Sequence, residues 1–96
     1  MSAAAALLDI FQRVRDLVAL PHNDFAWSSW RDADHALEEI DGIISRLQQG
    51  EMPDRLEMAT LFAPTGPMQE LSLSSDWGNR FLGLASEFDT AISGLS

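Results

Sequence analysis

The side chains of this chain that could do chemistry are carboxylates, serines and two histidines, because the sequence contains no cysteine. Without cysteine the protein has no disulfide, no thiolate nucleophile and no cysteine-ligated metal centre. Acid–base catalysis would need a histidine in a cleft beside a nucleophile. His22 has Asp24 and Ser28 nearby in the sequence, but no motif for positioning a nucleophilic serine accompanies them. We therefore predict surface or helix-capping roles for His22 and His35, and no catalytic residue.

The densest group of carboxylates lies between residues 31 and 46, where five acidic residues accompany two arginines. Asp34, Glu38 and Asp41 are spaced i, i+4 and i+7, so they lie along one flank of a helix. A carboxylate-bridged metal pair would need Glu-x-x-His motifs that point into the core from two helices, whereas these residues lie away from the apolar positions. We predict no metal and no cofactor. The flank is either a solvated surface or a docking face for an arginine- and lysine-rich partner.

The net charge of −9 limits the kinds of partner that the protein can have. Its six basic residues are all arginines scattered along the chain, so a phosphate backbone would be repelled, and we predict no binding to nucleic acid. An acidic surface suits a basic protein partner, because opposite charges speed the encounter and bias the choice of partner. The alternative is that the charge only keeps the protein in solution.

The helical spacing of apolar residues is interrupted once, between residues 61 and 75, in the stretch LFAPTGPMQELSLSS. Its second proline and the absence of a Gly-Lys-Ser/Thr run argue against a phosphate-binding loop. Leu71 and Leu73 alternate with serines, so a strand that pairs with a second chain is one interpretation. The other is an irregular loop at residues 63–74, in which Met68 and the two leucines close one end of the core. We favour the loop.

The same stretch resembles a pattern found in small, uncharacterised bacterial helical domains. The pattern is LFxxxGxMxELxL, and the residues that carry it are Leu61, Phe62, Gly66, Met68, Glu70, Leu71 and Leu73. Such families resemble the small acidic proteins that are encoded beside toxins as immunity or antidote partners. The resemblance implies a binding role and assigns no catalytic residue.

Four amphipathic segments must position these residues. Apolar side chains recur at helical spacing over residues 3–20, 30–49, 53–63 and 75–95. Pro21 and Pro64 end the first and third segments, and Gly50 follows the second. Serines are expected to cap the second and fourth helices, namely Ser28 or Ser29 and Ser74 or Ser75. Four such helices with short connections predict an all-α fold, a small antiparallel helical bundle or array in a single domain of residues 1–96.

Two further sets of residues offer surfaces for contact. Phe25 and Trp27 lie in the turn-rich segment before the second helix, where an exposed aromatic side chain would anchor a partner. Small uncharged residues recur along the back of the last helix, and they would let a second helix approach closely. Together with nearby leucines they form the candidate self-association set, which is Leu71, Leu73, Leu82, Gly83, Ser86 and Thr90.

These observations predict a non-enzymatic, immunity-, antidote- or regulator-like module that binds a basic protein. The alternative is a self-associating structural homodimer. No apolar run approaches the ~20 residues that a membrane span needs. The N-terminal stretch SAAAALLDIF also lacks the basic region that opens a secretory signal, so we expect a cytoplasmic location and no membrane partner. The candidate partner-binding residues are Phe25, Trp27, Asp34, Glu38 and Asp41.

Overall fold

Five α-helices form the regular structure of the part of the chain that the computed structural model describes, which is residues 2–26, 28–63 and 66–94. The predicted all-α fold class is confirmed, with one helix more than the predicted four. The helices are α1 (Ala3–Val18), α2 (Ala33–Gln48), α3 (Arg55–Phe62), α4 (Pro67–Ser74) and α5 (Gly78–Ser93).

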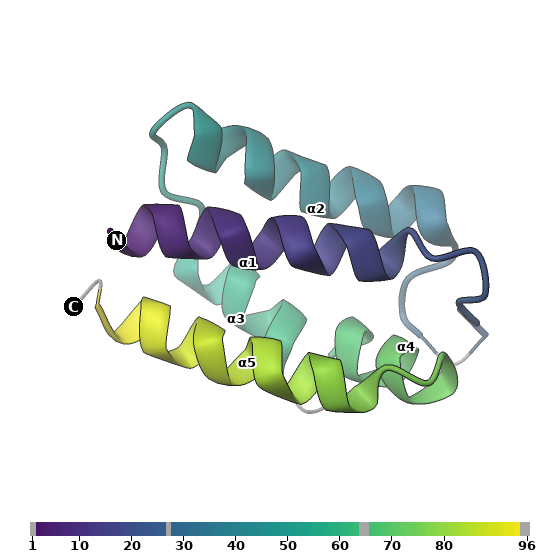
Figure 1. Cartoon of the computed structure of the whole chain (residues 1–96). Coiled ribbons are helices and arrows are strands. Elements are labelled where there is room, and N and C mark those ends of the chain that lie inside the picture. Colours follow the sequence, from purple (N-terminus) through teal and green to yellow (C-terminus); the bar gives the residue numbers. More distant parts are fainter. Residues whose placement is uncertain (1, 27, 64–65, 95–96) are drawn as a thin grey trace.

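Helix α1 is the central element of the arrangement (Figure 1). It lies between α2 and α5, and the chain runs along α1 in the direction opposite to its course in both neighbours. It packs directly against each of them, while α5 also packs against α3 and α4, which lie behind the α1–α5 pair. The fold is therefore a layer of three antiparallel helices with two short helices on one side.

The interior face of α1 and the phenylalanines of three helices lie in a core that also includes apolar side chains of α2 and α4. Leu7, Phe11 and Val14 follow one another at helical spacing and expose none of their surface. Phe62 of α3 stacks on Phe88 of α5 with ring centroids 4.3 Å apart. The edge of Phe11 meets Phe62 at 5.7 Å. Because such pairs add about 0.5–1.5 kcal/mol each beyond the area they bury, this cluster joins α1, α3 and α5.

The short helix α4 replaces the irregular loop predicted at residues 63–74, and the strand interpretation is wrong as well. Pro67 occupies its first turn, where a missing backbone N–H leaves no helical bond unmade. Gly66 precedes it, and a Cβ at this position would collide with the carbonyl oxygen of Thr60 in α3. The glycine and the proline therefore start a helix that lies tight against the end of α3.

Leucine and serine alternate at the end of α4, but the pattern does not reflect a strand. Met68, Leu71 and Ser72 are all fully buried, at the i, i+3 and i+4 spacing of one helical face. The Ser72 hydroxyl donates to the Gln69 carbonyl oxygen at 2.9 Å, which satisfies it inside the core. Leu73 faces outward instead. The strand interpretation assumed that the serines lie on an exposed face. A small hydroxyl side chain that bonds within its own helix can instead be buried.

The predicted serine caps of α2 and α5 are wrong. Asp32 caps α2, and its carboxylate accepts the backbone N–H of His35 at 2.9 Å. Helix α5 begins after Trp77 without a side-chain cap. The serines near both helix starts make other bonds, which hold the segment between α1 and α2 against α4.

That segment lies along α4 and exchanges hydrogen bonds with it. The Ser28 hydroxyl donates to the Pro67 carbonyl oxygen at 3.1 Å, and the Ser29 backbone N–H donates to the Glu70 carboxylate at the same distance. Further bonds join Asp24 to the C-terminal end of α4. The segment and α4 thus satisfy polar groups of each other that would otherwise need water.

The carboxamide of Asn23 joins the C-terminal end of α1 to the start of α5. Its nitrogen donates to the carbonyl oxygens of Leu17 and Val18, both at 2.8 Å, and so satisfies two of the carbonyls that a helix end leaves without partners. Its oxygen accepts the indole N–H of the buried Trp77 at 2.9 Å. One side chain therefore forms hydrogen bonds with polar groups at both helix ends.

Gly50 and Asp76 occupy equivalent positions after α2 and α4. Their φ angles are +80° and +69°, in the left-handed region. In both cases the N–H of the following residue donates to the carbonyl oxygen five residues earlier, at 2.8 Å after α2 and 3.0 Å after α4. Glycine adopts this conformation without strain, which confirms the predicted role of Gly50, whereas the Cβ of Asp76 makes it unfavourable.

Replacing Asn23 with leucine should lower the free energy of unfolding by about 2–3 kcal/mol, because the Trp77 indole and the Val18 carbonyl lose their partner and the Leu17 carbonyl keeps only the longer bond from Leu20. Urea denaturation at neutral pH measures the change. The control Asn23→Asp keeps an acceptor for the indole but loses both donors, so it should also be less stable than the wild type. A loss below about 0.5 kcal/mol for Asn23→Leu would contradict the role assigned to this side chain.

Replacing Asp76 with glycine should raise the free energy of unfolding by about 0.5–1 kcal/mol, because glycine removes the strained Cβ. The control Asp76→Asn removes the same charge from the end of α4 but keeps the Cβ, and so should gain less. Conversely, Gly50→Ala should lose about 1 kcal/mol, although its added Cβ meets nothing within 4 Å. Thermal denaturation of the three variants tests the argument, which fails if Asp76→Gly is no more stable than the wild type.

Candidate functional site

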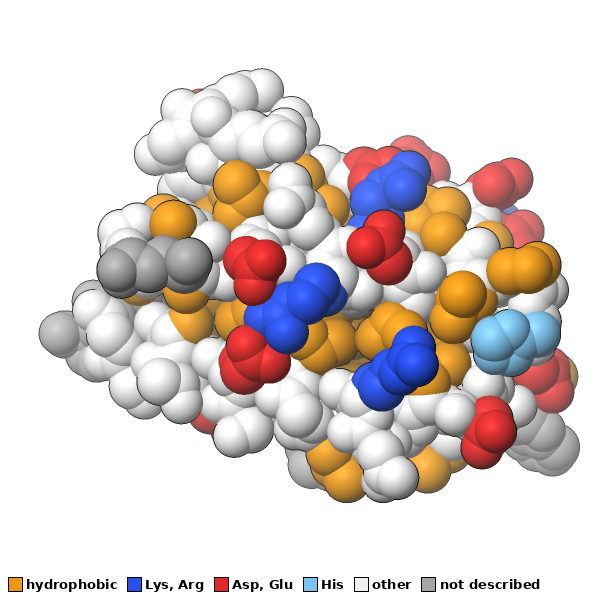
Figure 2. Space-filling model, viewed as in Figure 1, with side chains coloured by type: hydrophobic (Ala, Val, Ile, Leu, Met, Phe, Trp, Pro, Cys, Tyr) orange, Lys and Arg blue, Asp and Glu red, His pale blue; other side chains and the backbone are white. Residues whose placement is uncertain are grey.

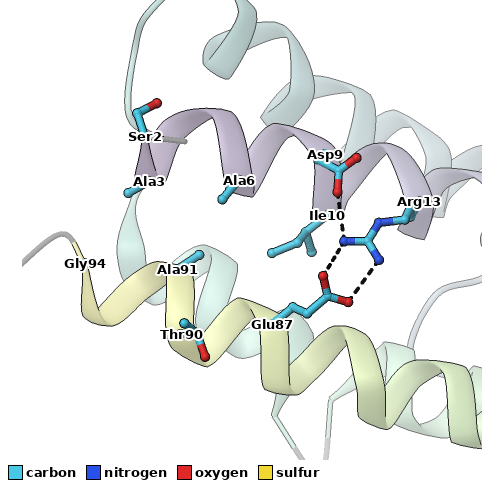
Figure 3. A pocket seen from close by; sticks show the side chains of 10 residues that line it. All are labelled: Ser2, Ala3, Ala6, Asp9, Ile10, Arg13, Glu87, Thr90, Ala91 and Gly94. Carbon is cyan, nitrogen blue, oxygen red and sulfur yellow. Dashed lines mark hydrogen bonds and ion pairs between the residues drawn. The ribbon is translucent and has the colours of Figure 1, made fainter.

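The face formed by α1 and α5 is hollowed between the two helices, and apolar side chains show along it (Figure 2). One hollow, of about 560 Å³, has a lining of mostly small side chains such as Ala3, Ala6 and Ala91 (Figure 3). The other, of about 340 Å³, lies beside Leu17 and Leu84. The larger hollow exists because residues with short side chains line both helices at this point.

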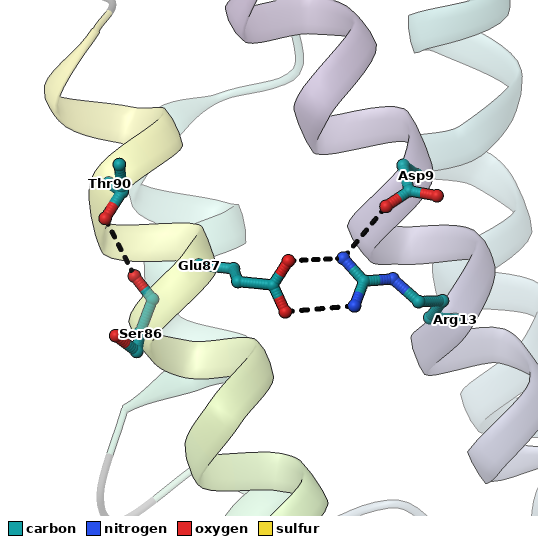
Figure 4. A network of polar contacts seen from close by, with 5 residues as sticks. All are labelled: Asp9, Arg13, Ser86, Glu87 and Thr90. Carbon is teal, nitrogen blue, oxygen red and sulfur yellow. Dashed lines mark hydrogen bonds and ion pairs between the residues drawn. The ribbon is translucent and has the colours of Figure 1, made fainter.

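An ion-pair network built on Arg13 of α1 spans this groove (Figure 4). Its guanidinium donates two hydrogen bonds to the Glu87 carboxylate of α5, at 2.9 and 2.6 Å, and lies 2.8 Å from the Asp9 carboxylate. Nearby, the Thr90 hydroxyl donates to the Ser86 carbonyl oxygen of its own helix at 3.2 Å. The network ties α1 to α5.

The network changes the acidity of Glu87. Hydrogen bonding from Arg13, with the attraction of its charge, lowers the pKa of Glu87, against a smaller opposing effect of desolvation. The same hydrogen bonds raise the pKa of Arg13. Both side chains are largely exposed, so the pair contributes little to stability.

The acidic flank of α2 is only partly available for a partner. Asp34 and Glu38 are exposed as predicted. Asp41, in contrast, is bonded to Arg15 of α1, with an oxygen 2.6 Å from the guanidinium Nε. The arginine therefore neutralises Asp41 and links α2 to α1. Of the three flank residues, Asp34 and Glu38 take part in no ion pair within the described residues.

Beside Glu38, a hollow of about 380 Å³ opens between α2 and α3. Its carboxylates are those of Glu38, Glu39 and Glu57, and Arg46 supplies its one guanidinium. Arg46 donates to Glu57 at 3.2 and 3.3 Å, while Glu39 accepts the indole N–H of Trp30 at 2.8 Å. We call these four charged residues the acidic hollow. Sequence reasoning missed it because Glu57 approaches α2 only through the packing of α3.

The predicted aromatic anchor is not present in the form expected. Phe25 is half-buried and packs against the core, so it is not the exposed contact that the sequence indicated. The segment that contains Phe25 folds back over the helices, which places this side chain against the core. Trp27, the other member of the pair, lies outside the described residues.

The two histidines occupy exposed or partly exposed positions. The ring Nε2 of His22 donates to the Ser75 carbonyl oxygen at 3.2 Å, and Nδ1 of His35 accepts the Arg31 backbone N–H at 3.2 Å. Both rings thus bond to the backbone, as predicted for capping or surface residues. Within the described ranges, no group of three or more histidine, aspartate and glutamate side chains is placed to hold a metal ion.

The candidate self-association set divides into buried and exposed members. Leu71 is fully buried, so its assignment to a contact surface is wrong. Leu73 and Leu82 are exposed on α4 and α5. Gly83 and Thr90 are also exposed, but they lie on the side of α5 that lines the groove with α1. The remaining member, the exposed Ser86, lies along the outer face of α5.

Comparison of the chain with protein-family models, curated proteins and solved structures finds no match. The resemblance of residues 61–73 to small bacterial helical domains therefore stays a prediction. In the described part of the chain, no helix has the length and apolar character needed to cross a membrane.

Replacing Arg13 with glutamine should raise the pKa of Glu87 towards the ordinary glutamate value, because the hydrogen bonds and charge that lower it are removed. Since the pKa of Glu87 is lower in the folded protein, the bridge stabilises the fold above the unfolded-state pKa and loses this effect as the pH falls through the folded-state value. An NMR titration of the Glu87 carboxyl carbon measures the pKa in both proteins. Identical curves would show that the bridge does not persist in solution.

Proposed function

We propose that the protein is a non-enzymatic interaction module that binds a basic protein partner through α2 and the acidic hollow. The observation that carries the proposal is the hollow itself, in which three carboxylates accompany a single guanidinium. Its remaining negative charge is not matched by a nearby lysine or arginine among the described residues. A basic side chain of a partner would complete the charge balance of this site.

The surroundings of the acidic hollow favour the same use. Asp34 lies one helical turn before Glu38, and both are exposed, so the two carboxylates extend the negative surface along α2. The bonds that Glu39 and Glu57 make to Trp30 and Arg46 hold their carboxylates in place before a partner arrives. Such preorganisation lowers the cost of ordering side chains on binding. The net charge of −9 would also steer a basic protein towards this chain.

The role of such a module would be to occupy the surface of a basic toxin or regulator, in the manner of an immunity or antidote protein. The acidic composition supports this proposal, and so does the resemblance of residues 61–73. Asp41 takes no direct part in it, because its carboxylate is committed to Arg15.

Native mass spectrometry of the untagged protein, isolated from its own cells at low salt, should reveal a stoichiometric complex with a basic protein that dissociates as salt is added. With the partner in hand, Asp34→Asn/Glu38→Gln should weaken binding at least about tenfold. The control Glu51→Gln/Asp89→Asn removes the same net charge from exposed positions elsewhere. Absence of any complex, or equal weakening in both double variants, would refute the proposed face.

A further inference from the structure

Leu73 at the end of α4 and Leu82 on α5 expose large apolar side chains on one surface. The exposed fraction is 68% for Leu73 and 59% for Leu82. Leu73 reaches Gly78, where its Cδ2 lies 3.5 Å from the position that a Cβ would occupy, and Gly78 precedes Leu82 by one helical turn. These three residues form an apolar strip that crosses from α4 to α5, which we call the Leu73–Leu82 strip.

Carboxylates surround this strip on the α4 side. A hollow of about 610 Å³ beside Leu73 is lined by Asp24 and Glu70, and a second hollow, of about 430 Å³, by Asp76 and Arg80. The ion pairs of the described residues include none of these three carboxylates. The exposed leucine thus lies between a hollow lined by two carboxylates and a second hollow in which the charge of Asp76 is matched by that of Arg80.

Two of the carboxylates are already held in position. Glu70 accepts the backbone N–H of Ser29 at 3.1 Å, and Asp24 accepts that of Ala26 at 2.9 Å. Each bond uses one oxygen of its carboxylate and leaves further acceptor capacity. A cation that approaches the hollow would therefore meet oriented acceptors rather than freely moving side chains.

We propose that the Leu73–Leu82 strip is a docking surface for a cationic amphipathic helix of a partner protein. Apolar side chains at helical spacing would cover the two leucines and fill the hollows beside Leu73. Lysine or arginine side chains next to them would reach Asp24, Glu70 and Asp76 while their aliphatic stems lie on the leucines. The apolar strip supplies affinity, and the carboxylates select a basic helix over a neutral or acidic one.

A second copy of this chain fits the surface less well. A two-fold interface places the same patch on both sides, so it would bring the three carboxylates of one copy against those of the other. Arg80 is the only basic residue among the described residues that line the two hollows. Two chains of charge −9 also repel each other over a longer range.

The inference rests on the proposed function in one respect, since both describe contacts with a basic partner, but it concerns a different surface.

The test uses a synthetic peptide of about four helical turns, made of leucine and lysine with the leucines at helical spacing. Backbone amide NMR shifts of the full chain locate the peptide. We expect the largest shifts at Leu73, Gly78 and Leu82. Calorimetry measures the Kd.

Leu73→Ser should raise the Kd of this peptide at least about tenfold, and Leu56→Ser should leave it unchanged. Leu56 is the matched control because its exposed fraction, 73%, is similar and it lies at the start of α3. A peptide with serine in place of every leucine should bind at least about tenfold more weakly. Equal binding of the two peptides, or equal effects of the two substitutions, would overturn the proposal.

The remaining outcomes separate this inference from the proposed function. Peptide shifts confined to Asp34 and Glu38, together with a salt-sensitive native complex, would overturn the strip as a docking surface and leave the α2 face standing. Shifts at the strip without any native complex would support the strip and refute the proposed function. A dimer of the protein alone that Leu73→Ser dissociates in analytical ultracentrifugation would assign the strip to a second copy, and so overturn the proposal.

Discussion

The carboxamide of Asn23 is the interaction on which the geometry of the α1–α5 pair depends. It donates to the last turn of α1 and accepts the indole N–H of Trp77, so both ends are fixed within a few ångströms of one another. Trp77 is buried, and its N–H has to find a partner inside the protein. Because α1 also packs against α2, this contact fixes one end of the three-helix layer, and the packing of α1 on its two neighbours fixes the rest.

The same end of the molecule contains most of the polar bonds between distant parts of the chain. The segment before α2 uses its serines and Asp24 to bond to α4, which leaves capping of α2 to Asp32. Helix α4 is short, and its inner face consists of Met68, Leu71 and the buried Ser72. Its attachment therefore relies on these hydrogen bonds together with Met68 and Leu71 in the core.

Much of the fold could be predicted from the sequence because long amphipathic helices leave a strong periodic signal. The apolar positions of α1, α2 and α5 all lie where the spacing indicated, and Gly50 ends α2 as expected. Helix α4 could not be predicted in this way. It has only two turns, and its inner face includes Ser72, whose burial depends on a bond within the helix.

The candidate surfaces were less predictable because they depend on pairs of side chains from different helices. The spacing of Asp34, Glu38 and Asp41 correctly indicates one flank of α2, but it contains no information about Arg15, which comes from α1. The acidic hollow similarly requires Glu57 of α3. The exposure of Leu73 and the burial of Leu71 follow from the helical conformation of α4. Interpreting the segment as an extended strand would place both leucines on the same side.

The hydrogen bonds between α4 and the segment before α2 make these two parts of the chain a single mechanical unit. Opening either one exposes unpaired hydroxyl, carbonyl and carboxylate groups of the other, so local unfolding of one favours unfolding of both. Glu70 of α4 accepts the backbone N–H of Ser29, and the next residue, Trp30, donates its indole N–H to Glu39 in the acidic hollow. Side chains of α4 and of the acidic hollow are thus held by the same short stretch of chain, so the conformation of residues 29 and 30 sets the position of carboxylates on two different helices.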